Sequence, residues 1–187
     1  MVRIAEASPS FKARMAGVSF FLTMLTAAFT ELFVRISGRL NFAADVAAGI
    51  IEVSGMVAVT LLFYYLFKPV NRSLSLLAAF FNLVALTFES FQSYNIGLIF
   101  GGCYCLLIGY LIFRSTFLPR ILGAPMAIAG LGWLTFLLPP LANHLSPYNL
   151  GAGILGEGIL MLWLLVMGLN VQRWKEKAPT TSVSIPT

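Results

Sequence analysis

The chain has 187 residues, of which 59% are hydrophobic and only 10% are charged, and its mean hydropathy is +0.89. Soluble domains carry about a quarter of charged residues, so this composition excludes a soluble globular domain and indicates a protein of the lipid bilayer. The net charge of +5 comes from basic residues that flank apolar segments. That pattern orients helices in a membrane and does not resemble a nucleic-acid-binding surface, so no nucleic-acid partner is expected.

A helix that spans the hydrocarbon core needs about 20 mainly apolar residues. Six such segments follow one another, with no room for a soluble domain: 13–35, 45–67, 73–93, 95–113, 120–141 and 148–171. We therefore predict an all-α, polytopic transmembrane bundle of six spans over residues 13–174, after a cytoplasmic segment at 1–12 and before a disordered cytoplasmic tail at 175–187. The first apolar run exceeds the roughly 7–15 residues of a signal-peptide core, so we expect an uncleaved first span.

The connection between the third and fourth spans is the least marked by sequence. Prolines and charges separate most of the other spans, as in Lys68-Pro69-Val70-Asn71-Arg72. Within residues 92–95 there is no proline and no charge. An unbroken helix over 73–113 would be about 60 Å long, twice the hydrocarbon thickness, so we predict a tight turn there.

The distribution of basic residues predicts that both ends of the chain are cytoplasmic. With the N-terminus inside, ten of the twelve Lys and Arg residues are cytoplasmic and only Arg35 and Arg39 are outside. Such an asymmetry is the positive-inside pattern, and it requires an even number of spans. The expected location is the inner or plasma membrane, with the lipid bilayer as the surrounding partner.

Five of the seven acidic residues fall in or beside predicted spans: Glu31, Asp45, Glu52, Glu89 and Glu157. With the predicted topology, all five map to the outer half of the membrane. At 1.5 Å per residue, Asp45 lies at the outer boundary, Glu89 lies about 7 Å inside it, Glu52 about 10 Å and Glu157 about 13 Å. A carboxylate facing lipid costs about 2.5–3.5 kcal/mol, so we expect these side chains to face one another or a wet cavity.

The candidate ligand-binding residues are those at this depth or just outside it: Glu31, Arg35, Glu52, Glu89, Gln92, His144 and Glu157. Several have an alternative interpretation. Glu31 and Arg35, four residues apart, are equally well explained as a structural ion pair, Asp45 as an N-cap, and His144 as a solvated loop residue. Glu52, Glu89 and Glu157 point to function more directly, although a purely structural polar network remains the alternative.

Gly97, Gly101, Cys105 and Gly109 recur at steps of four in the fourth span. Small residues at that spacing lie on one helix face and allow a neighbouring helix to approach. They predict packing inside the bundle or, as the alternative, a homo-oligomer formed through the same face. Cys103 and Cys105 point in different directions on a helix, which argues against a disulfide between them, and we interpret them as small packing residues.

No motif defines a chemistry. The sequence contains no H-E-x-x-H, no G-x-S-x-G and no phosphate-binding loop, and its single histidine cannot form a multi-histidine zinc site. We therefore predict no metal site and no cofactor, and a non-enzymatic role is favoured over an enzymatic one.

Four groups of residues resemble one known family: 30–35, 68–74, 109–115 with 118–123, and 156–157 with 162–166. The stretch Arg114-Ser115, followed by Leu118-Pro119-Arg120-Ile121-Leu122-Gly123, is the most specific. They are similar to the DUF4386 family of small bacterial membrane proteins, and the resemblance extends from the first span to Trp174. It implies a multi-span bundle and no particular activity, and it places Glu31 and Glu157 within family-like motifs.

These observations favour an outer-facing, carboxylate-lined cavity that binds or moves a cation, a proton or a small ligand. One alternative is an intramembrane enzyme acting on a lipid or isoprenoid, with a protonated carboxyl as general acid. Another is a non-catalytic accessory or immunity-type protein that acts through its small-residue helix faces.

Overall fold

The computed structural model describes residues 8–38, 42–90 and 94–178, which form helices and connecting turns with no strand among them. Two short 3-10 helices, η2 (Arg120–Leu122) and η3 (Thr135–Leu137), flank α5. The α-helices are α1 Pro9–Ser37, α2 Phe42–Phe67, α3 Arg72–Ser90, α4 Tyr94–Arg114, α5 Gly123–Leu134, α6 Pro139–Leu145, α7 Tyr148–Val166 and α8 Val171–Lys177.

Six of these helical segments are long and apolar enough to cross a membrane. They are Pro9–Val34, Phe42–Phe67, Arg72–Glu89, Asn95–Arg114, Arg120–Leu137 and Tyr148–Val166. The predicted all-α bundle with six spans is therefore confirmed, and the protein is a multi-pass membrane protein. α3 and α4 are separate helices, as predicted, and Gln92 between them lies outside the described residues.

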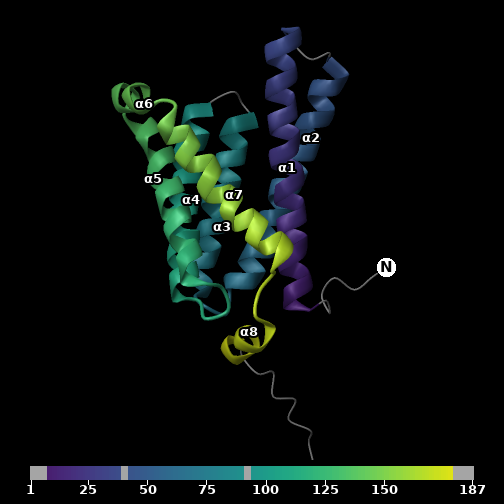
Figure 1. Cartoon of the computed structure of the whole chain (residues 1–187), viewed down its shortest axis with the longest axis vertical. Helices are drawn as coiled ribbons and strands as arrows, with labels where there is room; N and C mark the ends of the chain where they lie inside the picture. The colour runs from purple at the N-terminus through teal and green to yellow at the C-terminus, as the bar shows by residue number, and fades with distance from the viewer. Residues whose placement is uncertain (1–7, 39–41, 91–93, 179–187) are drawn as a thin grey trace, which may run out of the picture.

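The helices form two groups (Figure 1). α4 packs against both α3 and α5, and α7 packs against α5, which makes one continuous group. α1 and α2 form an antiparallel pair, in which α1 contacts α7 and α2 contacts α3. We call the end of the bundle that carries α6 the α6 end and the opposite end, which carries α8, the α8 end (Figure 1).

The α1–α2 pair is buried only toward the α8 end. All five buried residues of α2 lie between Val59 and Phe67, and no residue from Phe42 to Ala58 is buried. In α1, the last buried residue among the described side chains is Thr23. The pair therefore stands apart from the other helices at the α6 end, as the ribbons also show (Figure 1).

Aromatic and cationic contacts attach the pair at the α8 end. Lys12 is 4% exposed, and its Nζ lies 3.5 Å from the centre of the Tyr65 ring. Tyr65 stacks on Trp174 of α8, whose Nε1–H donates a hydrogen bond to the Leu66 carbonyl at 2.9 Å. A buried indole N–H needs such an acceptor, so Trp174 links α8 to the end of α2.

The predicted fifth span, 120–141, is wrong at its C-terminal end. The membrane helix ends in η3 at Leu137, and a new helix, α6, begins at Pro139. Proline disfavours helical backbone in the residue before it, and Leu138 is extended, with φ −120° and ψ 94°. His144, predicted to lie in a loop, is in α6, and its side chain is exposed.

The predicted sixth span, 148–171, and the predicted disordered tail, 175–187, also need correction. α7 ends at Val166, and Gly168, with φ 67°, follows the helix end in a left-handed conformation that suits glycine. The chain is then helical again through Lys177, because the Asn170 side chain caps α8 by accepting from Arg173 N–H. Residues 179–187 of the predicted tail lie outside the described residues.

Candidate carboxylate site

Glu157 lies on α7 where this helix meets α4 and α5. Its Oε1 accepts a hydrogen bond from Trp133 Nε1–H at 2.8 Å and one from the Cys105 thiol at 3.2 Å. Trp133 comes from α5 and Cys105 from α4, so donors from two neighbouring helices converge on one carboxyl oxygen. Such an arrangement is suited to hold a carboxylate inside a membrane domain, where water is not available to solvate it.

Glycines allow α4 and α5 to approach closely enough to form this site. A Cβ added at Gly109 would lie 3.0 Å from the Gly123 carbonyl, and one at Gly102 would lie 2.9 Å from the Gly130 carbonyl. The contacts are reciprocal, because a Cβ at Gly123 or Gly130 would lie 2.8 Å from the carbonyl of Gly109 or Gly102. Two glycines seven residues apart on each helix thus leave room only for backbone.

α7 is seated on α5 by two further glycines beside Glu157. The Trp133 indole occupies the space that a Cβ of Gly153 would need, and a Cβ at Gly156 would meet the Pro125 carbonyl. Gly153 lies one helical turn before Glu157, on the same face of α7. The ring that packs on Gly153 therefore presents its N–H to the carboxyl one turn further along.

Tyr104 adds an unpartnered hydroxyl to this region. It is 3% exposed, and its hydroxyl has no hydrogen-bond partner among the described residues. The phenol is close enough to the Cys105 thiol and the Glu157 carboxyl for electrostatic interaction with both. Buried hydroxyls are nearly always hydrogen-bonded, so this group retains the capacity to bind something else.

Glu89 connects Glu157 to the α1–α2 pair. It is half-buried near the C-terminal end of α3, and its Cγ occupies the space that a Cβ of Gly97 would need. Its carboxyl interacts electrostatically with those of Glu157 and Glu52. Among the described residues no hydrogen bond joins these three acids directly, so their coupling is electrostatic.

A hydrogen bond between α2 and α3 shows which residue of α2 lies at the same depth in the bundle as Glu89. Asn82 Nδ2–H of α3 donates to Thr60 Oγ1 of α2 at 2.6 Å, and both residues are buried. Val53 is seven residues before Thr60, and Glu89 is seven residues after Asn82. Seven residues make about two turns, so Val53 and Glu89 lie about 10 Å from this bond toward the α6 end, on the facing sides of antiparallel helices.

The remaining predicted site residues are placed less centrally. Glu31 is exposed on α1, and His144 is exposed on α6. The side chain of Arg35 and the whole of Gln92 lie outside what the structure describes. Within the described residues no group of three or more His, Cys, Asp and Glu side chains is arranged to hold a metal ion.

The predicted stripe of small residues does not form one interface. Gly97 faces Glu89 and Ala85 of α3, Gly109 faces α5, and no atom lies within 4 Å of a Cβ added at Gly101. A step of four residues turns about 40° beyond one full helical turn, so three steps move the stripe about 120° around the helix. Cys105, predicted to be a packing residue, additionally donates to Glu157.

The model of the family described as "Domain of unknown function (DUF4386)" matches residues 88–168. The DUF4386 resemblance is thereby confirmed for this segment. The match is shorter than the resemblance seen in the sequence, which extended from the first span to Trp174. It includes Glu89, Cys105, Trp133 and Glu157, whereas the α1–α2 pair with Glu52 lies outside it.

One relative of the chain is an uncharacterized protein of Archaeoglobus fulgidus. It is 29% identical over 127 residues, which cover 60% of this chain and 76% of the relative. No solved structure matches the chain at a significant level. These comparisons therefore assign no activity, and the multi-span bundle rests on the six long apolar helices.

Sequence reasoning identified the three acids but missed Trp133 and Tyr104. A usable signal was present for Trp133, because an indole N–H in the middle of an apolar span must find an acceptor. An intramembrane carboxylate is the strongest acceptor such a span can offer. Tyr104 gave no comparable signal, since whether a phenol is hydrogen-bonded depends on neighbours far away in sequence.

Proposed function

We propose that this membrane protein binds and releases a proton or small cation at Glu157, with Glu89 and Glu52 leading to it from the α6 end of the bundle. The observation that carries the proposal is the position of Glu157, whose carboxyl oxygen accepts hydrogen bonds from Trp133 and Cys105 in the interior of the bundle. In the predicted topology the α6 end faces outward, so the ion would enter from the outer side.

The cost of an intramembrane carboxylate favours a role beyond packing. An acid on a spanning helix costs about 2.5–3.5 kcal/mol on insertion scales, and such residues commonly mark ion or proton pathways. A Gln at position 157 could still accept from Trp133 and Cys105 without carrying a charge. The presence of an ionisable group at this position is therefore better explained by exchange of a cation or proton.

The interaction between the acids supports a pathway rather than a single site. Glu89 interacts electrostatically with both Glu157 and Glu52, and Glu52 interacts in turn with Asp45, seven residues before it on α2. A positive charge that arrives at one acid changes the electrostatic potential at the next acid, and this favours transfer along the series. The series from Asp45 to Glu157 leads from the α6 end toward the middle of the bundle.

Proton flux in reconstituted vesicles tests this proposal. The full chain is reconstituted in liposomes that enclose a pH-sensitive dye, and a pH gradient is imposed with valinomycin and potassium present to dissipate charge. Wild type should equilibrate the gradient faster than empty liposomes, and Glu157→Gln should reduce this rate at least about tenfold. Glu176→Gln, which changes an exposed acid on α8, should leave the rate unchanged.

The triple variant Glu52→Gln, Glu89→Gln and Glu157→Gln provides the decisive comparison. If it folds, as judged by helix content and gel filtration, and still conducts as the wild type does, the acids do not form the pathway. If neither protons nor alkali cations cross in wild type and neither binds to the detergent-solubilised protein, the proposal is wrong.

A further inference from the structure

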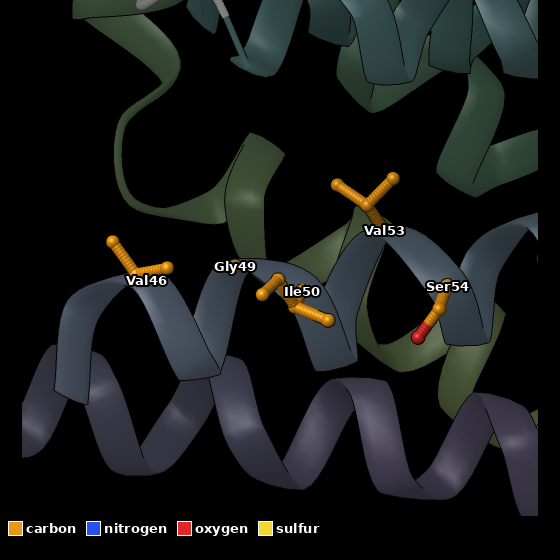
Figure 2. Close-up of a pocket in the computed structure, with 5 residues that line it drawn as sticks. All are labelled: Val46, Gly49, Ile50, Val53 and Ser54. Carbon is orange, nitrogen blue, oxygen red and sulfur yellow. The ribbon is translucent and has the colours of Figure 1, made fainter. Parts of the chain in front are cut away.

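A groove follows the first half of α2, at the α6 end where the α1–α2 pair stands apart. It has a volume of about 540 Å³ and is lined by Val46, Gly49, Ile50, Val53 and Ser54 (Figure 2). Four of these five residues are apolar. Val46 and Val53 point away from α1, so the groove lies on the side of α2 that the hairpin partner does not cover (Figure 2).

The groove is lined by residues of α2 alone, and it continues the face of α2 that meets α3 further along the helix. Val53 lies seven residues before Thr60, and Thr60 contacts Asn82 of α3 through the 2.6 Å hydrogen bond. Residues seven apart share one helix face, so the groove begins where this face loses its contact with α3. The register set by Thr60 and Asn82 places Glu89 on the opposite side of the opening, level with Val53.

The charged side chains that α2 and α3 place beside the groove, among the described residues, are acidic. Glu52 adjoins Val53 and is half-buried, and its carboxyl interacts electrostatically with that of Glu89 across the opening. From Phe42 to Phe67, from Ser73 to Ser90 and from Tyr148 to Val166 there is no Lys or Arg. α2 and α3 thus contribute carboxylates and no Lys or Arg within these ranges, and a low-dielectric surrounding strengthens the attraction of the carboxylates for a positive charge.

A second observation indicates that a ligand group can be accommodated beyond Glu89. The buried Tyr104 hydroxyl, unpartnered among the described residues, lies in the electrostatic neighbourhood of Glu157. On the same face of α4, one turn toward the α6 end, nothing lies within 4 Å of a Cβ added at Gly101. Gly97, which Glu89 contacts, lies one turn further again, so the free space beside Gly101 lies between the levels of Glu89 and Tyr104 along α4.

We propose that the groove binds an amphiphilic organic cation. The apolar part of the ligand lies along Val46, Gly49, Ile50 and Val53, and its positive charge lies against Glu89 and Glu52. This inference rests on the proposed function and specifies its substrate class: a hydrophobic cation would enter laterally between α2 and α3 and be exchanged against protons at the carboxylates. The combination of an apolar wall with facing acids fits such a ligand better than a fully hydrated metal ion, which would gain nothing from the apolar wall.

Binding of tetraphenylphosphonium to the detergent-solubilised full chain, measured by equilibrium dialysis, tests the inference. Tetraphenylborate, of nearly the same shape but negative charge, serves as the matched probe. The wild type should bind the cation and bind the anion at least about tenfold more weakly. Glu89→Gln should weaken cation binding about tenfold, which corresponds to about 1.4 kcal/mol.

A glycine in the groove allows a steric test without a folding penalty. No atom lies within 4 Å of a Cβ added at Gly49, so Gly49→Phe should fill the groove, leave the fold intact and reduce binding at least about tenfold. Ala124→Phe adds the same ring at an exposed position of α5 and should leave binding unchanged. Should Gly49→Phe fail to fold, Ile50→Trp, at a groove position that is 63% exposed, takes its place with the same expected loss.

Three results would overturn the inference: no binding of the cation to wild type, equal binding of cation and anion, or full binding in both Glu89→Gln and the folded groove variant. The proposed function is tested separately by proton flux. If Glu157-dependent flux persists while tetraphenylphosphonium fails to bind, only the substrate class is wrong. If the flux is absent and the cation binds in a Glu89-dependent manner, the groove is a binding site and the pathway through Glu157 is wrong.

Discussion

The two groups of helices differ in how closely their members are packed. α4, α5 and α7 cross through glycines with backbone against backbone, and donors on α4 and α5 fix the Glu157 carboxyl on α7. In the α1–α2 pair, no described side chain after Thr23 in α1 and none from Phe42 to Ala58 in α2 is buried. The comparison contrasts a closely packed frame around Glu157 with a loosely packed neighbouring pair, and the DUF4386 match covers the closely packed part.

Among the changes considered, glycine substitutions should produce the largest difference in free energy of unfolding between the two groups of helices. Gly109→Leu places a side chain where even a Cβ would lie 3.0 Å from the Gly123 carbonyl, so we expect about 3 kcal/mol of destabilisation from overpacking. Gly49→Leu meets open space and improves helix propensity, so its free energy of unfolding should be unchanged or up to about 1 kcal/mol higher. Steric trapping in bicelles measures both, and equal effects would remove the distinction between the regions.

The hydrogen bond between Thr60 and Asn82 is expected to make an intermediate contribution to the free energy of unfolding. Asn82→Leu removes the side-chain hydrogen bond that joins α2 to α3 below the groove, and interhelical hydrogen bonds in membranes contribute about 0.6–1.7 kcal/mol. Thr60 keeps its own bond to the Met56 carbonyl, so no hydroxyl is left unpaired. The variant should also widen the opening, which a spin-label distance between α2 and α3 would report; an unchanged distance would contradict the register described above.

Trp133→Phe should have a smaller effect on stability. Phenylalanine retains much of the contact with Gly153 but removes the N–H that donates to Glu157, so we expect a loss of about 1 kcal/mol. Phe63→Leu, a conservative change in the buried core of α2, provides a control of similar cost that does not touch the acid. Only Trp133→Phe should alter proton flux, and an effect of equal size in both variants would assign Trp133 a purely structural role.

The sequence predicts the spans well because their signal is local. Hydropathy and length identify the six apolar segments. Connections were predicted at Lys68, Pro69 and Arg114, and helices end there in the structure, α2 at Phe67 and α4 at Arg114. The boundary at Pro139 was predictable from the same chemistry, since proline restricts Leu138. The end of α7 and the helix α8 were not, because they depend on Gly168 and on Trp174 reaching Leu66 more than a hundred residues away.

The site was predictable in its acids but not in its partners. Counting 1.5 Å per residue along the predicted spans places Glu52, Glu89 and Glu157 in the outer half of the membrane. This count does not require knowing which helices are neighbours in the bundle. That Glu157 meets Cys105 and Trp133 depends on α7 lying against α4 and α5. The opening beside α2 depends on where the α1–α2 pair stops packing against the other helices. The residue pattern within α1 or α2 does not predict that position.

Infrared difference spectroscopy of the Glu157 carboxyl tests the central claim most directly. Acid-minus-base spectra of the reconstituted full chain should contain a protonated-carboxyl band that is lost in Glu157→Gln, shifted in Trp133→Phe and unchanged in Glu176→Gln. The band should also change when a transported cation is added at constant pH. A wild-type spectrum identical to that of folded Glu157→Gln would mean that Glu157 does not exchange protons, and the account given for this site would be wrong.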